Sequence, residues 1–205
     1  MLKPNCRIFI IRHGLTDENI IPYSHLHTAK LTEEGKRQTE KTANILRNIK
    51  FDVILSANTN YAKDTSTIVA NIFNASVQYC TDLNERNIGN ISNTQAKDLN
   101  KNYLTLKGKD AWDYKLNDNI ESFAEAYRRI IKFIKFTSKK NSGQTVCMVS
   151  HGLLMRILLG GLGYIPYQKI FFTTLINAGY IELECARNKV EIKSVFGLKD
   201  RTRFY

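Results

Sequence analysis

Apolar and polar positions alternate along the chain with two periods, one typical of buried strands and the other of helices. Short continuous apolar runs predict strands that are buried on both faces. These runs are 6–12, 52–56 and 144–150. A shorter strand is expected at 77–80, and a hairpin or edge pair at 178–184 and 190–196. Apolar positions that recur every three to four residues predict helices at 32–49, 60–73, 121–136 and 152–160.

This alternation of strands and helices predicts an α/β fold. We expect a three-layer sandwich, with a mostly parallel central sheet and helices on both faces. The chain has 205 residues and shows no internal repeat, low-complexity stretch or Pro/Gly/Ser-rich linker. We therefore expect residues 1–205 to form a single domain, which is long enough to bury a sizeable core.

Composition and the lengths of the apolar runs limit the cellular locations that we expect for this protein. No apolar run approaches the ~20 residues that span a bilayer. The apolar stretch at 8–11 is also too short for the core of a signal peptide. We therefore expect a cytoplasmic protein with no membrane partner. The cysteines are widely scattered, which predicts small buried side chains in a reducing compartment and no metal site. They are Cys6, Cys80, Cys147 and Cys185.

The net charge is +11, from 30 Lys and Arg residues against 19 Asp and Glu residues. A basic surface raises the local concentration of anions such as phosphorylated metabolites, nucleic acids and acidic membranes. The positive residues are dispersed, and no DNA-binding or RNA-binding signature is present. We therefore expect a small phosphorylated substrate and no nucleic-acid partner, while the sequence leaves the oligomeric state open.

Two histidines occupy equivalent places at the ends of predicted strands. His13 ends the first strand, His151 ends the strand at 144–150, and each is followed by glycine. Ligands of α/β sheets bind at the carboxyl ends of the strands, where a helix N-terminus offers free N–H groups to an anion. A lone histidine is more often structural, but two in this setting favour a shared anion site. Arg12 adds a planar fork that suits phosphate oxygens.

Six segments resemble, in order, the motifs of the histidine phosphatase superfamily, which includes the cofactor-dependent phosphoglycerate mutases. Together they extend over nearly the whole chain, and Ile120 replaces the glycine that usually precedes the fourth motif. The resemblance implies the fold of the phosphoglycerate mutases. The segments are RHGLTDEN at 12–19, LTEEGKRQ at 31–38, LNERNIG at 83–89, ESF at 121–123, SHG at 150–152 with Arg156, and Asn177-Ala178.

The resemblance also implies a role for each matching residue. His13 would be the nucleophile that becomes phosphohistidine, with no metal ion and no cofactor. Glu85 would protonate the leaving oxygen and then activate water, while Arg12 and His151 would hold the phosphoryl oxygens. A phosphoryl transition state spreads charge over three oxygens, so fixed cations and N–H donors suit this chemistry. Further substrate-binding positions are Thr16, Asn19 and Gly152.

Simpler roles remain open for several of these residues. Glu85 and Arg86 could form a surface ion pair, which contributes little to stability. Asn19 could stabilise a turn, and Thr16 could cap a following helix. The glycine-rich segment 160–163 lacks the lysine of a phosphate-binding loop, so we interpret it as the end of the preceding helix.

One departure from the family pattern affects a residue that is expected to bind phosphate. Tyr61 stands where the family usually has a second phosphate-binding arginine. Tyrosine donates one hydrogen bond but carries no charge. The loss of one charged contact is expected to cost ~2–4 kcal/mol, or ~10²–10³ in rate. Lys63 or Arg86 are candidates to replace the charge, and we count Tyr61 and Arg86 among the substrate-binding residues.

A second departure favours a phosphatase over a mutase. The mutases carry paired arginines after a tryptophan, and these arginines hold the carboxylate of the substrate. Here Trp112 is followed by Asp113 and Tyr114, and an acidic side chain repels a carboxylate. We therefore predict a metal-independent phosphomonoester phosphatase, a hydrolase. The alternatives are a phosphoglycerate mutase and a weakened phospho-ligand-binding or interaction module. Specificity is expected to lie in segments 20–30 and 90–120.

Overall fold

The structure is a computed structural model that describes residues 5–17, 29–89, 93–106, 108–186 and 189–200. Asn19 and part of the expected specificity segment 20–30 lie outside these residues. Six strands form one sheet in the order β3-β2-β4-β1-β5-β6. The strands are β1 (Cys6–Arg12), β2 (Val53–Ser56), β3 (Val77–Tyr79), β4 (Thr145–Ser150), β5 (Thr173–Ala186) and β6 (Lys189–Asp200).

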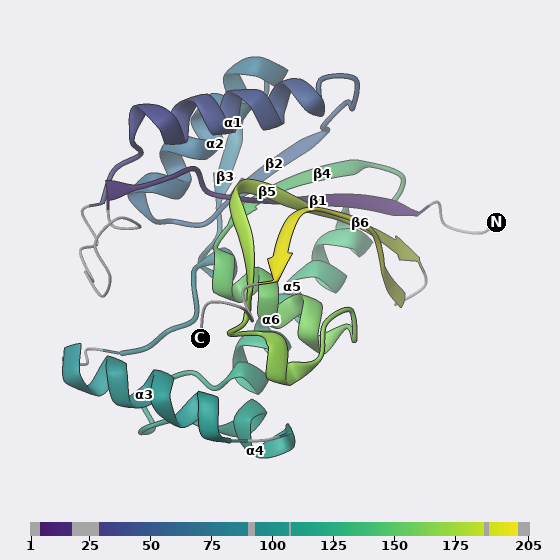
Figure 1. Ribbon diagram of the computed structural model, residues 1–205. Coiled ribbons are helices and arrows are strands. Elements are labelled where there is room, and N and C mark those ends of the chain that lie inside the picture. The colour runs from purple at the N-terminus through teal and green to yellow at the C-terminus, as the bar shows by residue number, and fades with distance from the viewer. Residues whose placement is uncertain (1–4, 18–28, 90–92, 107, 187–188, 201–205) are drawn as a thin grey trace.

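The first four strands of this order run parallel, and β5 is antiparallel to both of its neighbours. Helices α1 (Glu33–Ile45) and α2 (Asn60–Phe73) cover one face of the sheet, and α5 (Phe123–Lys140) and α6 (Gly152–Gly161) cover the other (Figure 1). The predicted three-layer α/β fold with a mostly parallel sheet is therefore confirmed. Short 3₁₀ turns, η2 (Thr81–Leu83) and η3 (Tyr167–Lys169), lie among the connections.

Strand β1 shows why its sequence is continuously apolar. Ile8 and Ile10 belong to the core on the side of α5 and α6, whereas Phe9 and Ile11 belong to the core on the side of α1 and α2. Each of the four side chains is at most 1% exposed. Full burial of such a side chain contributes about 1.5–3 kcal/mol, so β1 anchors both layers.

The helix boundaries differ from the predicted ones for local reasons. Helix α1 begins after Thr32, whose hydroxyl accepts a hydrogen bond from the Gly35 N–H, and it ends at Ile45 rather than at 49. Helix α5 begins after a capping box formed by Ser122 and Glu125, and it extends to Lys140. Helix α2 extends over the predicted range 60–73, but the side chain of Ile72 near its end is 38% exposed.

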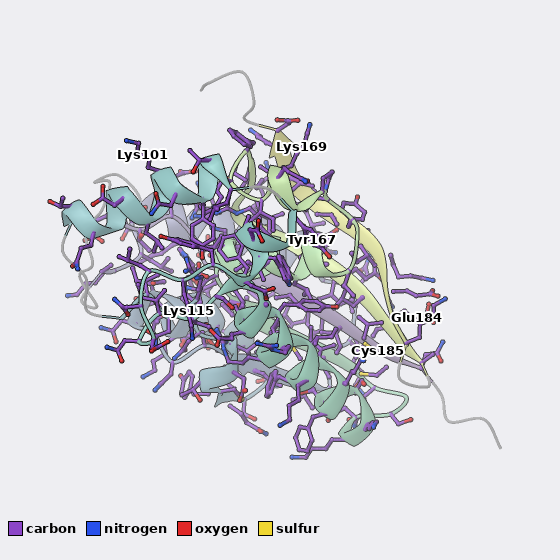
Figure 2. The ribbon with its side chains drawn as sticks, turned by 90° about the horizontal axis from the view of Figure 1, so that it is seen from below. Lys101, Lys115, Tyr167, Lys169, Glu184 and Cys185 are labelled. Carbon is purple, nitrogen blue, oxygen red and sulfur yellow. The ribbon has the colours of Figure 1, made fainter. Side chains whose placement is uncertain are left out.

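Two helices in the segment between 90 and 120 were not predicted. Helices α3 (Asn93–Thr105) and α4 (Gly108–Asp113) lie beyond α5 and α6, away from the sheet (Figure 1). Seen from below, Lys101 of α3 lies on the opposite side of the molecule from Glu184 and Cys185 of β5 (Figure 2). Aromatic stacking holds these helices. The Tyr103 ring lies 4.5 Å from that of Phe123, and the Trp112 ring lies 4.6 Å from that of Tyr167.

Cys6, Cys147 and Cys185 are buried, Cys80 is half-buried, and all four are free thiols. Burial raises the pKa of Cys147 to about 12, which keeps this thiol protonated. Within the described ranges, no helix is long and apolar enough to cross a membrane.

Candidate active site

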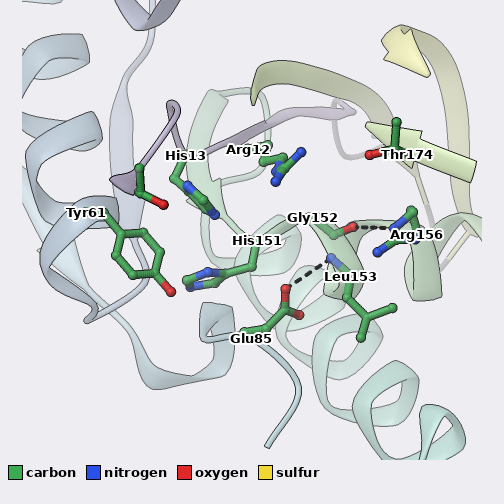
Figure 3. A pocket seen from close by; sticks show the side chains of 10 residues that line it. Arg12, His13, Tyr61, Glu85, His151, Gly152, Leu153, Arg156 and Thr174 are labelled. Carbon is green, nitrogen blue, oxygen red and sulfur yellow. Dashed lines mark hydrogen bonds between the residues drawn. The ribbon is translucent and has the colours of Figure 1, made fainter. Parts of the chain in front are cut away.

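Parallel pairing of β1 and β4 brings the two strand-terminal histidines together. Arg12 pairs with Ser150 at the ends of the two strands, and the His13 N–H donates to the Ser150 carbonyl at 3.0 Å. His151 is the next residue along and precedes α6. The two imidazole centres lie 5.4 Å apart, so both rings face one site. Figure 3 shows the His151 ring below that of His13, with Glu85 next to His151.

The hydrogen bonding of His13 defines its tautomer. Its Nδ1 atom lies 2.8 Å from the Gly14 carbonyl oxygen. A carbonyl oxygen only accepts, so Nδ1 carries the proton and Nε2 keeps a lone pair. Burial, with help from nearby Arg12 and His151, holds the pKa of His13 well below its ordinary value. His13 is therefore a neutral imidazole at physiological pH, which is the form that acts as a nucleophile.

The segment 31–38 holds the turn that follows His13. A Cβ atom on Gly14 would overlap the Gly35 carbonyl oxygen, and one on Gly35 would overlap the Leu15 carbonyl oxygen. Both positions therefore require glycine, because the two backbones touch. The Thr32 N–H donates to the Leu15 carbonyl at 3.0 Å, and the Leu15 N–H donates to Gln38 Oε1 at 3.2 Å. The turn after His13 is thus held by direct contacts from Thr32, Gly35 and Gln38.

The Asn-Ala pair fixes the backbone of His13 from the other side. The Asn177 side-chain amide and the Ala178 N–H both donate to the His13 carbonyl at 3.3 Å. The register of β5 shifts here, and Ala178 has a φ of 56°, which is unusual for a residue with a side chain. The Thr42 hydroxyl holds this bulge by donating to the Ala178 carbonyl at 2.8 Å. Strained backbone of this kind is concentrated at functional sites.

Glu85 lies against the N-terminus of α6. Its carboxylate accepts hydrogen bonds from the Leu153 N–H at 3.0 Å and the Leu154 N–H at 2.8 Å. These are among the first N–H groups of the helix, which have no partner within the helix itself. The Ser150 hydroxyl holds the backbone two residues before Glu85, because it donates to the Leu83 carbonyl at 2.8 Å. The carboxyl group is thereby held beside His151 (Figure 3).

His151 carries a buried nitrogen that faces the site. The residue is 1% exposed, and its Nε2 atom has no hydrogen-bond partner among the described residues. Burial lowers the pKa of His151, and the nearby Glu85 carboxylate opposes this shift. A buried polar atom without a partner is costly, so this nitrogen is suited to a ligand oxygen.

Arg12 crosses the first residue of α6. Its guanidinium donates to the Leu175 carbonyl of β5. A Cβ atom on Gly152 would lie only 2.8 Å from Arg12 Nε. Glycine at 152 therefore leaves the space in which the guanidinium lies beside the two imidazoles.

These residues enclose a cavity of about 200 Å³. It is smaller than the ~300–1,000 Å³ typical of pockets for drug-sized ligands. The cavity is lined by Arg12, His13, Thr16, Tyr61, Glu85, His151, Gly152, Leu153, Arg156 and Thr174. The structure therefore brings together seven of the nine residues predicted for the site.

Arg86 does not line this cavity. It is 5% exposed, and its guanidinium donates to the Glu121 carbonyl at 2.5 Å and to the Tyr103 hydroxyl at 2.8 Å. It also lies 5.0 Å from the ring centres of Tyr103 and Phe123. Arg86 therefore does not form a surface ion pair with Glu85. It does not replace the missing positive charge in the cavity either, because its guanidinium binds groups in the protein interior.

Tyr61, which stands in sequence where the arginine was expected, lines the cavity beside the two imidazoles. Its ring centre lies 4.5 Å from that of His13 and 5.5 Å from that of His151. The Thr65 hydroxyl fixes this arrangement, since it donates to the Tyr61 carbonyl at 2.7 Å and accepts from the Gly14 N–H at 3.2 Å. Lys63 does not supply the charge either, because its ammonium group lies over the Tyr79 ring.

Three further residues of the cavity were not predicted as site residues. They are Leu153, Arg156 and Thr174. Arg156 belongs to the SHG motif, and this motif is the sequence signal that could have identified it as a site residue. Its guanidinium donates to the Gly152, Ile170 and Thr173 carbonyls at 2.6–3.2 Å, which joins the start of α6 to that of β5. The described residues contain no group of three or more His, Cys, Asp or Glu that could hold a metal ion.

The chain is similar in sequence to a known protein family and to proteins that are named as phosphatases. A sequence model of the histidine phosphatase superfamily (branch 1) matches residues 8–196. An adenosylcobalamin/alpha-ribazole phosphatase of Escherichia coli is 27% identical over 170 residues, which cover 80% of this chain and 83% of the relative. Phosphoserine phosphatase 1 of Hydrogenobacter thermophilus is 26% identical over 191 residues, or 90% of each chain.

Solved structures show the same fold. A mutant phosphoserine phosphatase from Entamoeba histolytica in complex with phosphoserine aligns with a TM-score of 0.78 at 19% identity, over 93% of this chain and 96% of that one. A mycobacterial glucosyl-3-phosphoglycerate phosphatase aligns with a TM-score of 0.74 at 19% identity, over 94% and 99% of the two chains.

Proposed function

Since this chain belongs to the histidine phosphatase superfamily, we propose that it is a phosphatase that hydrolyses phosphomonoesters through a phosphohistidine at His13, without a metal ion. The observation that carries this proposal is the pair of imidazoles whose centres lie 5.4 Å apart, with the Glu85 carboxyl group beside them in one small cavity. A nucleophile, a proton donor and cationic contacts for phosphate are the parts that this reaction needs.

The first step transfers the phosphoryl group to the protein. The lone pair on His13 Nε2 attacks phosphorus, and the bond between phosphorus and the alcohol oxygen breaks. Glu85 in its protonated form gives its proton to that oxygen, so the alcohol leaves neutral. The Nδ1–H bond to the Gly14 carbonyl supports this direction of attack, because it leaves only Nε2 available.

The second step releases phosphate. Glu85, now a carboxylate, takes a proton from water as the water oxygen attacks the phosphorus of phosphohistidine. The bond between phosphorus and Nε2 breaks, and the electron pair returns to the imidazole. Glu85 thus ends the cycle protonated, and His13 ends it neutral. The two N–H groups of α6 that bind the carboxylate keep it in place for both steps.

Polar groups around the cavity, one of them a cation, stabilise the charge that spreads over the phosphoryl oxygens. Arg12 provides a guanidinium, His151 a buried nitrogen, and Gly152 an N–H at the start of α6. Thr16, which is buried, provides a hydroxyl among the residues that line the cavity. Contacts of this type are worth about 10²–10³ in rate each when they are fixed before the reaction begins. Asn19 is proposed as a further contact.

The substrate class follows from the size of the cavity and from the relatives. A volume of about 200 Å³ suits a phosphoryl group with a small attached alcohol. We propose a small phosphorylated substrate and a cytoplasmic location, with residues 1–205 acting as one domain. No cofactor and no nucleic-acid partner is part of this proposal.

Tyr61 favours a second candidate, a phospho-ligand-binding module with weakened turnover. The aromatic ring occupies the place of a charged contact, and neither Lys63 nor Arg86 replaces it. Such a module would still bind phosphate, because Arg12 and the N-terminus of α6 remain. It would turn over slowly, because the transition state carries more charge on its oxygens than these groups can offset.

A single assay separates these candidates. The protein is incubated with p-nitrophenyl phosphate in EDTA, beside the His13→Ala variant. Turnover that resists EDTA and disappears in the variant supports the phosphatase. An absence of turnover together with measurable phosphate binding supports the module. Interconversion of phosphoglycerates, measured in parallel, would instead assign the protein to the mutases.

A further inference from the structure

Glu121 and Arg129 form an ion pair next to the turn that carries Glu85. Arg129 Nε lies 2.8 Å from Glu121 Oε1, and Arg129 Nη2 lies 2.8 Å from Glu121 Oε2. The contact is therefore bidentate, with both nitrogens on one edge of the guanidinium in use. The two side chains are only 15% and 23% exposed, so solvent screens them less than a surface pair.

The remaining edge of the guanidinium contacts the backbone just before Glu85. Arg129 Nη1 donates to the Asp82 carbonyl at 2.6 Å and to the Asn84 carbonyl at 3.1 Å. Helix α5 therefore contacts the residue immediately preceding Glu85 and the 3₁₀ turn η2 that leads to it.

Glu121 contacts the backbone just after Glu85. Its carboxylate accepts from the Asn87 N–H at 3.0 Å, and its own N–H donates to the Asn87 carbonyl at 2.8 Å. Its carbonyl accepts from the Arg86 guanidinium at 2.5 Å. The ion pair thus contacts the chain on both sides of Glu85, although neither of its members lines the cavity.

We propose that the Glu121–Arg129 pair, which we call the clamp, is the positioning unit that holds the Glu85 carboxyl group at the reacting oxygen. This inference rests on the proposed function. A displacement of about 1 Å in a catalytic group lowers the rate by about 10²-fold, and a general acid contributes about 10²–10⁴-fold in total. The clamp acts through the placement of Glu85 and touches no substrate atom.

The leaving group of the substrate distinguishes this role from a merely structural one. An alkoxide leaves poorly and needs the proton of Glu85, whereas p-nitrophenolate leaves well without it. Arg129→Gln is therefore expected to lower kcat/KM, which reports only the first transfer, by about tenfold or more on glycerol 2-phosphate and by about twofold at most on p-nitrophenyl phosphate. A general loss of folded protein would lower both rates equally.

The neighbouring residue offers a matched control. Arg128 lies on the same helix, is exposed, and forms no ion pair among the described residues. Arg128→Gln removes the same charge and is expected to leave both rates unchanged. Arg129→Lys keeps the charge but loses the planar fork, so it should recover only part of the glycerol 2-phosphate activity. Glu121→Gln tests the other partner if Arg129→Gln fails to fold.

A double variant tests whether the clamp acts through Glu85. Glu85→Gln alone should lower hydrolysis of glycerol 2-phosphate more than Arg129→Gln does. Adding Arg129→Gln to it should have little further effect, because residues that act through one group are not additive. Equal losses on both substrates in Arg129→Gln, or full additivity with Glu85→Gln, would overturn the inference and leave the proposed function standing.

Amide hydrogen exchange keeps the inference testable if the unsubstituted protein hydrolyses neither substrate, an outcome that would count against the proposed function alone. The Leu153 and Leu154 N–H groups donate to Glu85, so their exchange reports whether the carboxylate is in place. Arg129→Gln is expected to speed their exchange about tenfold relative to Arg128→Gln. Equal exchange in the two variants would overturn the clamp.

Discussion

The cavity has two walls of unlike chemistry. One wall consists of the ends of β1 and β4 and the start of α6, where Arg12, His13 and His151 lie. The other is the first turn of α2, where Tyr61 presents a ring 4.5 Å from the centre of His13. Backbone pairing between parallel strands fixes the first wall, whereas a single side chain near the start of a helix forms the second.

On the proposed function, this difference separates the parts that make the reaction possible from the part that sets its rate. The strand-end wall holds the proposed nucleophile and a cation, and two N–H groups of α6 in this wall bind the Glu85 carboxylate. The α2 wall lacks the charge that would complete the grip on the transition state. Substitutions on the first wall should therefore abolish turnover, while substitutions on the second should tune it.

The largest effect is expected from His13. His13→Asn keeps a polar side chain of similar reach but removes the nucleophile, so kcat on p-nitrophenyl phosphate should fall by at least about 10⁴-fold. Rapid mixing with a phosphomonoester that carries radioactive phosphorus, followed by an alkaline quench, should show an acid-labile phosphoprotein in the unsubstituted chain and none in the variant. A variant that retained a tenth of the rate would remove His13 from its proposed role.

A smaller but still large effect is expected from Gly152. In Gly152→Ala the new Cβ would lie 2.8 Å from Arg12 Nε, so the guanidinium must move away from the cavity. We expect kcat/KM to fall by about 10²-fold. The Tm should change little, since alanine is a better helix former than glycine and the displaced group is the flexible end of a side chain.

Arg12→Met provides the comparison for that variant. If both changes act through the guanidinium, combining them should lower kcat/KM little further than Arg12→Met alone. Independent, multiplying losses would show that Gly152 contributes by another route, such as its own N–H group.

A moderate effect, in the opposite direction, is expected from the α2 wall. Tyr61→Arg should raise kcat/KM about tenfold, because it adds a cation beside His13 and His151. Tyr61→Phe, which removes only the hydroxyl, should stay within about twofold of the unsubstituted protein. If the arginine variant is folded yet no faster, the missing charge at Tyr61 does not limit the reaction.

The smallest effect concerns stability and pH, and it tests whether the two histidines of the strand-end wall are held neutral. The folded protein lowers the pKa of both His13 and His151, chiefly by burial. Below about pH 6.5 the unfolded chain binds protons that the folded chain does not, so the free energy of unfolding should fall as the pH falls. Above that pH both states are neutral, and the two histidines contribute no slope.

Urea unfolding at pH 7.5, 6.5 and 5.5 measures this contribution. Each histidine adds up to about 1.4 kcal/mol per pH unit below 6.5. His13→Asn should therefore lose less stability than the unsubstituted protein between pH 6.5 and 5.5. Parallel curves would show that His13 takes up its proton in the folded state as readily as in the unfolded one.

The sequence predicted the elements whose pattern follows from burial on both faces. Strands β1 and β4 show this best, because the central residues of each contribute to the core on both sides of the sheet and are therefore apolar. Helices α3 and α4 were not predicted, because they lack such a pattern of buried apolar residues. Helix α3 is mostly polar, and aromatic rings such as Tyr103 and Phe123 hold it to the rest of the fold through contacts that leave no helical period.

The site divides in the same way. His13 and His151 were predictable because glycine follows each at the end of a parallel strand, and topology alone brings such ends together. Arg86 was placed wrongly from its sequence, since its neighbour Glu85 faces the cavity while its own fork binds Tyr103 and Glu121. Local sequence does not say which of two adjacent polar side chains faces inward.

By itself the sequence determined the layers, the strand ends that meet, and the two imidazoles at those ends. The spacing of apolar residues and the glycines that end the strands are local properties of the chain, so they can be recognised without the fold. Tertiary structure alone decided that Arg129, more than 40 positions beyond Glu85, holds the backbone around that carboxyl group. Contacts of this kind depend on how α5 packs against η2. A guanidinium satisfied by backbone carbonyls gives no pattern that composition or spacing could reveal.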